Sequence, residues 1–142
     1  MPQTNRSVDT AYFTTLVGRE AACRLMTRAG LLDEAGSPPT QLDMVTFWRL
    51  CAENIHACDD ESHGVAKVPV PRGSLTMLFT AAAQGDDLDE ALQRFADAAH
   101  LVRKECVVSV SRGHDTTRFT VAPAEPADLR AEIYAECFLI VA

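Results

Sequence analysis

Four side chains of the types that bind zinc lie near one another in the sequence: Cys51, His56, Cys58 and His63. Zinc sites commonly carry their ligands as Cys-x-x-Cys or as two histidines one helical turn apart. The intervals here are five, two and five residues. This spacing favours a core cysteine pair with surface histidines, and we expect no bound metal. A metal-binding or enzymatic use of the segment stays open as an alternative.

Three consecutive acidic residues, Asp59, Asp60 and Glu61, follow this segment. Such a run could bind a cation or supply paired carboxylates for acid–base chemistry. It also follows the end of an expected helix, where the helix dipole disfavours negative charge. We therefore interpret the run as a solvated turn.

Motifs for catalysis or phosphate binding are absent from the sequence. No serine lies in a Gly-x-Ser-x-Gly context, and no cysteine lies in a recognisable nucleophile motif. The glycines at 64, 73 and 85 are isolated, so they form no phosphate-binding loop. The chain is accordingly expected to be neither an enzyme nor a holder of a cofactor.

Aromatic side chains at helical spacing could line an apolar ligand pocket. Trp48 follows Phe47 on one expected helix, and Phe79 lies on another. Residues of this kind more often belong to the hydrophobic core. His100 lies at the edge of an apolar helix face. Trp48, Phe79 and His100 are therefore only candidates for contact with a ligand.

The elements that would position these residues are mainly helices. Apolar residues that recur every three or four positions predict helices over residues 11–17, 19–29, 42–58, 75–84, 88–102 and 127–142. Alternating β-branched residues predict a hairpin with strands over 106–111 and 118–121. Two prolines make the segment 65–71 extended. The expected fold is α+β, one mostly helical domain over residues 1–142 with a small antiparallel β-sheet near 106–121.

Capping residues mark three of the helix starts. We expect Thr40, Ser74 and Asp87 to act as N-caps, and Glu90 to complete a capping box with Asp87. The helix over 88–102 has the clearest amphipathic pattern in the chain, and this pattern places Phe95 in the core.

Composition limits the partners of the chain. Its 142 residues carry 13 basic and 20 acidic side chains, a net charge of −7. Such a surface repels phosphate backbones, so the chain alone is not expected to bind DNA. No apolar run approaches the roughly 18 residues of a membrane span, and no secretory leader is visible. The five cysteines then indicate reduced thiols in the cytoplasm.

An ordered set of segments resembles a known family. These segments are 17–31, which ends in Ala-Gly-Leu, the long helix 42–54, the helix start Arg-Gly-Ser-Leu-Thr-Met-Leu-Phe over 72–79, the stretch Asp-Asp-Leu-Asp-Glu-Ala-Leu-Gln-Arg-Phe over 86–95, and the strands 107–111 and 118–121. Together they resemble the N-terminal effector-sensing domain, of the arabinose-binding type, of AraC-family bacterial transcription regulators. In that family a pair of helix-turn-helix units follows, so the chain is expected to be truncated before its DNA-binding part.

The resemblance implies a regulatory domain that binds a small-molecule effector, forms a homodimer and reaches DNA only through the missing part. The residues at the end of the last helix are apolar on all sides and cannot all face one core. Phe138, Ile140 and Val141 are therefore candidates for dimer contacts. The alternatives are a small metal-binding or enzymatic domain that uses Cys51–His63, and a dimerisation module without a ligand.

Overall fold

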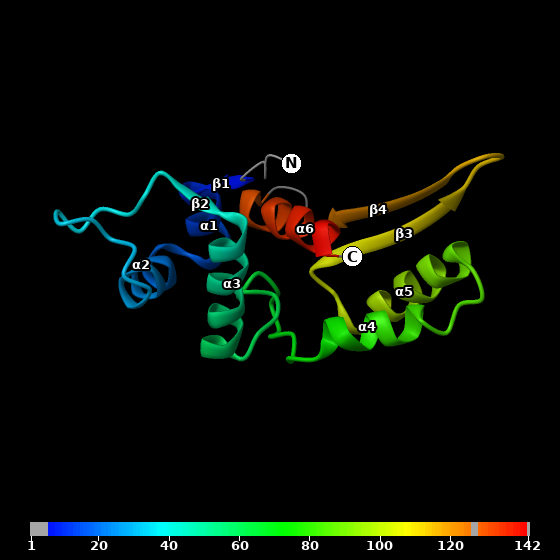
Figure 1. The fold of residues 1–142 in the computed structure, drawn as a ribbon. Helices are drawn as coiled ribbons and strands as arrows, with labels where there is room; N and C mark the ends of the chain where they lie inside the picture. Colours follow the sequence, from blue (N-terminus) through cyan, green and yellow to red (C-terminus); the bar gives the residue numbers. More distant parts are fainter. Residues whose placement is uncertain (1–5, 126–127, 142) are drawn as a thin grey trace. The chain divides into compact units, whose positions relative to one another are not determined.

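The structure is a computed structural model that describes residues 6–125 and 128–141, with side chains up to Leu139. The chain forms two compact units, one that ends at Cys58 and one that begins at Asp59 (Figure 1). Helices dominate both units, and each unit holds one two-stranded antiparallel sheet. This confirms the predicted α+β class. None of the helices in the described part is long and apolar enough to cross a membrane.

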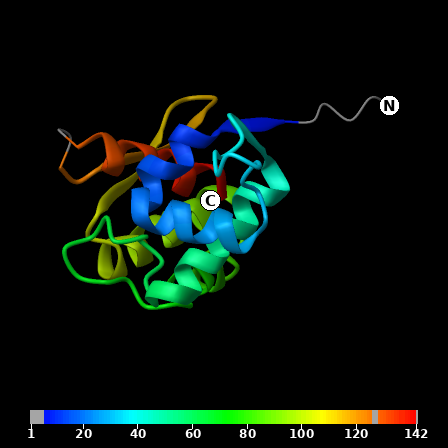
Figure 2. The same ribbon diagram turned by 90° about the vertical axis from the view of Figure 1, so that its left-hand side faces the viewer.

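The first unit contains three helices and a short sheet. Its elements are β1 (Ser7–Asp9), α1 (Thr10–Val17), α2 (Arg19–Arg28), β2 (Gln41–Asp43) and α3 (Met44–Cys58). The helices pack against one another in pairs (Figure 2). Their common core includes Phe13 and Phe47, whose ring centroids lie 6.0 Å apart in an edge-to-face arrangement. The predicted helices are confirmed here, whereas the β1–β2 sheet was not predicted.

The start of α3 differs from the prediction. Leu42 belongs to β2 and pairs with Val8, so the helix begins at Met44. The carboxylate of Asp43 accepts the N–H of Thr46 at 2.9 Å, and so provides a hydrogen-bond partner for an N–H group in the first turn of α3. The predicted N-cap at Thr40 is therefore wrong, because the sheet continues past that residue before the helix can begin.

The second unit consists of a helix pair, a hairpin and a final helix. Its elements are α4 (Ser74–Ala82), α5 (Leu88–Val102), β3 (Cys106–Arg112), β4 (Thr117–Pro123) and α6 (Leu129–Val141). β3 pairs with β4 with Val108 opposite Val121, which confirms the predicted hairpin. α4 packs on α5, α5 contacts β3, and α6 contacts β4 (Figure 1).

The sequence predicts two N-cap residues in this unit, Ser74 and Asp87, and only Asp87 is confirmed. Asp87 is the N-cap of α5 and accepts the N–H of Glu90 at 2.8 Å. The Glu90 carboxylate accepts the N–H of Asp86 at 2.9 Å, one residue before the N–H used in a capping box, so the box itself is formed only in part. Ser74 is instead the first residue of α4, and its hydroxyl donates to the carbonyl of Pro71. The N–H groups at this helix start are bound by a residue distant in sequence, Glu61. The prediction of Ser74 as N-cap is therefore wrong.

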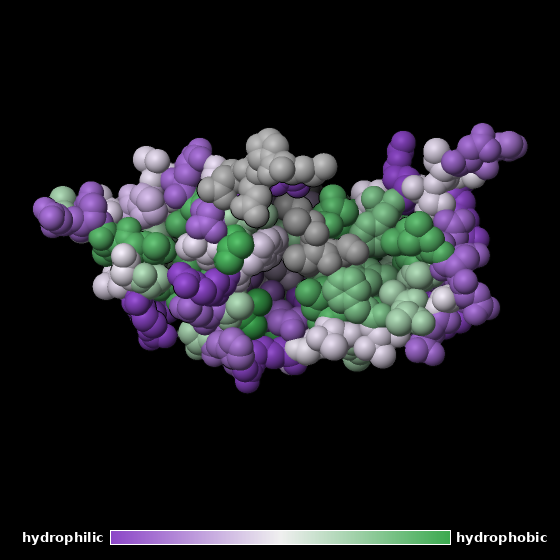
Figure 3. All heavy atoms as spheres, viewed as in Figure 1, coloured by the Kyte–Doolittle hydropathy of each residue, from purple (hydrophilic) through white to green (hydrophobic). Residues whose placement is uncertain are grey.

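The core of the second unit forms where the hairpin meets the helices. Its buried members are Leu78, Phe95, Ala96, Ala99, Cys106, Val108 and Phe138. Phe95 packs edge-on against Phe119 and Phe79, with centroids 5.8 and 5.5 Å away. This confirms that Phe95 is a core residue. Apolar side chains also reach the surface over α4, α5 and the hairpin, where Figure 3 shows a green face.

Candidate functional site

A turn at the start of the second unit is built around the buried carboxylate of Asp60. Its Oδ1 accepts from the N–H and hydroxyl of Ser62 and from the N–H of Val70, all within 2.8 Å. Its Oδ2 accepts the N–H of Gly64 at 2.8 Å. Burial alone would raise the pKa of Asp60, but these hydrogen bonds outweigh it and hold the pKa below its usual value.

The acidic run is therefore only partly the solvated turn that was predicted. Asp59 is exposed and pairs with Arg72. Asp60 is 4% exposed, and Glu61 is also largely removed from solvent. The interpretation is wrong for these two residues. Asp60 accepts hydrogen bonds from the segment that follows it, and Glu61 accepts them from the start of α4 and from Arg103.

The segment 65–71, here called the strap, bends at residues 66–68, so it is not extended throughout as predicted, and it is held at one end by this turn. The N–H of Val70 donates to Asp60, and the carbonyl of Val70 accepts the N–H of Glu61 at 2.8 Å. The strap has no regular secondary structure, as its prolines predicted. It forms one wall of the cavity described below.

The second unit also contains a buried arginine. Arg103, which is 2% exposed, follows α5 and donates to Glu61 Oε2 at 2.7 Å, to Glu105 Oε1 at 3.2 Å and to the Tyr134 hydroxyl at 2.6 Å. The Tyr134 hydroxyl in turn donates to Glu105 Oε1 at 3.0 Å. We call Glu61, Arg103, Glu105 and Tyr134 the Arg103 cluster.

The two carboxylates of the Arg103 cluster are not equally satisfied. Glu61 also accepts the N–H groups of Gly73 and Leu75, at 2.6 and 2.9 Å, at the start of α4. The helix dipole stabilises negative charge at that position. Glu105 has no such support. Its Oε2 is buried and has no hydrogen-bond partner in the described part of the chain.

A cavity of about 510 Å³ lies between the strap and the segments around Glu105. It is lined by residues 65–71 of the strap and by Val102, Lys104, Glu105, Ala124, Glu125, Asp128 and Ala131. Lys67 and Glu125 form an exposed ion pair among these residues. Small-molecule sites commonly measure about 300–1,000 Å³. We call this the strap cavity.

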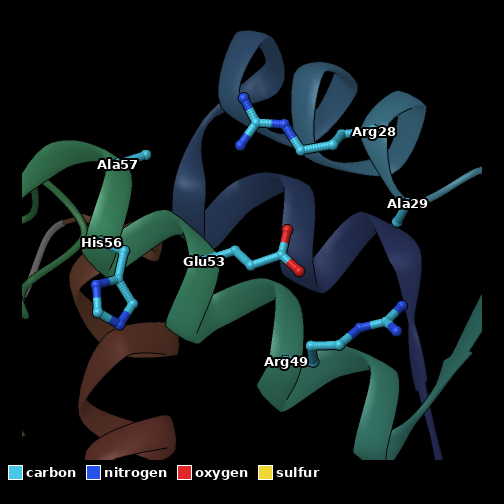
Figure 4. Close-up of a pocket in the computed structure, with 6 residues that line it drawn as sticks. All are labelled: Arg28, Ala29, Arg49, Glu53, His56 and Ala57. Atoms are coloured by element: carbon cyan, nitrogen blue, oxygen red, sulfur yellow. The ribbon is translucent and has the colours of Figure 1, made fainter.

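A second hollow, of about 580 Å³, lies on the first unit between α2 and α3 (Figure 4). Its lining residues are Arg28, Ala29, Arg49, Glu53, His56 and Ala57. The two arginines and His56 are exposed and Glu53 is half-buried. This hollow is an open groove between solvent-exposed charged side chains. None of its lining residues has a buried side-chain nitrogen or oxygen atom that lacks a hydrogen bond.

The three residues predicted to contact a ligand do not line the strap cavity. Trp48 packs edge-on against Phe47, with centroids 4.9 Å apart, in the aromatic cluster of the first unit. Phe79 is 42% exposed on α4, and His100 is exposed on α5. None of the three is among the residues that line the strap cavity. Their role in ligand contact stays a prediction.

The possible metal ligands named above, Cys51, His56, Cys58 and His63, do not form a metal-binding cluster. Within the described ranges, no three His, Cys, Asp or Glu side chains are placed to hold a metal ion. Cys51 is buried and Cys58 is exposed, so the predicted core cysteine pair is wrong for Cys58, which ends α3. His56 is exposed as predicted. His63 is buried instead, because the Asp60 turn packs its ring edge-on against Tyr134.

The candidates for dimer contacts lie at the end of α6. Phe138 is 3% exposed and packs between Phe95 and Tyr134, with the Arg103 guanidinium 5.3 Å above its ring. The next residue, Leu139, is 46% exposed. The side chains of Ile140 and Val141 lie outside the described residues. A dimer contact at this helix end stays a prediction.

Comparison with known proteins identifies the family. The model of the arabinose-binding domain of AraC transcription regulators, N-terminal, matches residues 21–142. No curated protein and no solved structure matches the chain. The family match spans most of the 142 residues, including all elements of the second unit. The chain therefore belongs to the family of N-terminal arabinose-binding domains of AraC transcription regulators.

Proposed function

We propose that this domain senses a small-molecule effector and that the effector binds in the strap cavity. One observation carries the choice of site: the strap cavity, of about 510 Å³, is lined mainly by valine, proline and alanine residues with charged groups among them, as small-molecule sites commonly are. The family to which the chain belongs supplies the regulatory context.

The Arg103 cluster would transmit the presence of the effector. Glu105 shares Arg103 with Glu61, which holds the start of α4, and with Tyr134 on α6. A ligand in the strap cavity contacts the segment that carries Glu105, and so changes how strongly Glu105 holds Arg103. If the cluster has two arrangements, the effector favours the one to which it binds more tightly, and so shifts the positions of α4 and α6.

We infer that the domain acts in the cytoplasm as part of a longer regulator, and that DNA is bound by a separate helix-turn-helix part. The net charge of −7 supports this division, because an acidic surface does not attract a phosphate backbone. We propose no catalytic activity, since the family is regulatory. The isolated domain should therefore show no DNA affinity at physiological salt in a fluorescence anisotropy titration.

Self-association is the second part of the proposal. The exposed Leu139 at the end of α6 supports it, since an apolar helix end gains from being covered. Most soluble homo-oligomers are two-fold dimers. Sedimentation at micromolar concentration should give a dimer that weakens in Leu139→Ser. A monomer mass near 15.5 kDa in both proteins would contradict this part and leave the ligand site untouched.

A bulky substitution on the cavity wall tests the location of the site. A thermal-shift screen of small metabolites should yield a ligand that stabilises the wild-type domain by about 2.7 kcal/mol at 100 times its Kd. Ala124→Trp adds an indole at an exposed lining position and should abolish this shift. Ala57→Trp makes the same change beside the groove of the first unit and should leave the shift intact. The reverse pattern would move the effector site to that groove.

A further inference from the structure

We infer that the ligand of the strap cavity is an uncharged, mainly apolar molecule with an aliphatic or aromatic body, and that it is not a sugar. This inference rests on the proposed function, because it assumes that the strap cavity is the ligand site. It goes further by stating the chemical class of the ligand. The residue types of the lining, the hydrogen bonds of the strap and the balance of the exposed charges each support it.

Most of the residues that line the strap cavity are apolar. Nine of the fourteen described lining residues are valine, alanine or proline, and the other five are charged. These fourteen therefore include no hydroxyl, amide or aromatic side chain. A sugar gives up the hydrogen bonds between its hydroxyls and water when it binds, and the protein must replace them. This lining offers a polyol few such partners, although the family name refers to arabinose.

The backbone of the strap adds few donors. Its two prolines have no N–H. Three further N–H groups already donate within the protein: those of Val65 and Ala66 to Ser62, at 3.0 and 3.1 Å, and that of Val70 to Asp60, at 2.8 Å. Five of the seven strap residues therefore have no N–H to donate to a ligand. The strap contributes mainly apolar side-chain surface to the cavity.

The exposed charges of the lining favour neither an anion nor a cation. They are two basic groups, Lys67 and Lys104, and two acidic groups, Glu125 and Asp128. Lys67 pairs with Glu125, Lys104 donates to a backbone carbonyl of α5 at 2.6 Å, and Asp128 accepts a backbone N–H of α6 at 2.9 Å. A ligand group that displaced one of these partners would exchange one hydrogen bond for another, with little net gain in free energy.

Glu105, the fifth charged residue of the lining, belongs to the buried Arg103 cluster. Its side chain is 1% exposed and accepts hydrogen bonds from Arg103 and Tyr134. A charged ligand would lose hydration on entering the cavity, and the balanced charges of the lining would not compensate this loss. An uncharged ligand avoids the cost.

Val68 gives the cavity an apolar side chain that is largely in contact with water. It lines the cavity and is 75% exposed. A ligand body that covers it removes apolar surface from water, and this gain needs no polar partner. The lining therefore rewards apolar contact more than hydrogen bonding.

The test compares ligands that differ in chain length or in polarity. Butan-1-ol, hexan-1-ol and octan-1-ol are titrated into the purified protein and followed by NMR of its backbone amides. Mannitol, which has six hydroxyls on the same six-carbon chain, and L-arabinose are the polar probes, and hexylamine and hexanoate are the charged ones. We expect the Kd of the alcohols to fall about fourfold for each added methylene group. Mannitol and L-arabinose should not bind, and neither charged probe should bind more tightly than hexan-1-ol.

Variants at exposed positions locate the contact. Val68→Ser should weaken hexan-1-ol binding about fourfold, because it removes apolar surface from the lining. Val45→Ser makes the same change at a residue of α3 that is 79% exposed and outside the lining, and it should change nothing. Ala124→Trp should abolish the binding of all three alcohols, as it should abolish the binding of the effector.

The outcomes separate this inference from the proposed function. If mannitol or L-arabinose binds as tightly as hexan-1-ol and Ala124→Trp abolishes that binding, the apolar class is wrong and the strap cavity stands. Tenfold tighter binding of hexylamine or hexanoate, or no alcohol binding at millimolar concentration, would also overturn the class. If the alcohols bind equally well to the wild type, Val68→Ser and Ala124→Trp, both the cavity and the class are wrong. Binding that strengthens with chain length, weakens in Val68→Ser and is lost in Ala124→Trp supports the two proposals together.

Discussion

The guanidinium of Arg103 donates to the hydroxyl of Tyr134 at 2.6 Å and so joins the segment after α5 to the middle of α6. The same guanidinium binds Glu61 and Glu105, so one buried side chain connects the turn at the start of the second unit, the entry to β3 and the last helix. A polar centre of this kind is costly to leave half-paired. The stability of the second unit should therefore depend strongly on Arg103.

Replacing Arg103 with Met should destabilise the second unit by about 3–5 kcal/mol, because two buried carboxylates lose their cation. The measurement is urea unfolding followed by circular dichroism. Arg94→Met is the matched control, since Arg94 forms an exposed pair with Glu90 that is worth at most about 1 kcal/mol. Equal stabilities for the two variants would contradict the importance of the Arg103 cluster.

Stability should fall as the pH drops from about 6.5 to about 4, because of His63. Burial lowers the pKa of His63 to about 4, whereas the unfolded chain protonates near 6.5. The unfolded state thus binds the additional proton within this window, and the stabilisation, complete above pH 6.5, decreases by up to about 1.4 kcal/mol per pH unit. Asp60 reduces the stability further only at lower pH, where its carboxylate becomes protonated, because its pKa lies below the usual value.

Urea unfolding at pH 7.0, 6.0 and 5.0 measures this slope. His63→Gln should flatten it, because glutamine does not titrate. His114→Gln should leave it unchanged, since His114 is almost fully exposed. A slope that persists in His63→Gln would assign the pH dependence to another group.

Phe95→Ala should cost about 3–5 kcal/mol, as expected for truncating a buried phenylalanine. Phe95 lies between Phe79, Phe119 and Phe138, so its loss leaves a cavity bordered by three rings. Phe79→Ala removes a ring of the same size from a half-exposed position and should cost less. A melting temperature for Phe95→Ala within a degree or two of wild type would refute the packing described here.

Two of the five cysteines should react with Ellman's reagent in the folded protein. Cys23 and Cys58 are exposed, whereas Cys51, Cys106 and Cys137 are buried. Burial also raises the pKa of the Cys106 thiol to about 12, which keeps it protonated and unreactive. All five thiols should react in guanidinium chloride. A third fast thiol in the native protein would show that a buried cysteine is accessible.

The elements that the sequence predicts well are those defined by local pattern. The 3.6-residue period of α5 and the alternation in β3 and β4 each lie within one segment, so the residues alone were enough to predict them. The β1–β2 sheet escaped prediction because each strand has three residues and its central pair, Val8 with Leu42, spans 34 positions. Periodicity in a three-residue strand is too brief to recognise.

The candidate site was missed for a related reason. Glu61 and Arg103 are 42 residues apart, and nothing in either neighbourhood indicates that they pair. The one local signal is Arg103 with Glu105, because residues two apart in an extended segment point to the same side and here carry opposite charges. This pair directly precedes the apolar residues of β3, so it could have indicated charged side chains that are buried beside the core. The residues predicted to contact a ligand, Trp48, Phe79 and His100, are not among those that line the strap cavity.

The sequence separations within the Arg103 cluster have a consequence for folding kinetics. Tyr134 contacts the carbonyl of Glu61 across 73 positions, and closing so long a loop costs entropy before any contact compensates it. The α4–α5 pair and the β3–β4 hairpin form over much shorter separations. We expect the cluster to assemble after the rate-limiting step, so that Tyr134→Phe accelerates unfolding and leaves the refolding rate nearly unchanged, with a φ-value near zero in stopped-flow measurements. The residues that hold the second unit together would then determine how long it stays folded, and not how fast it folds.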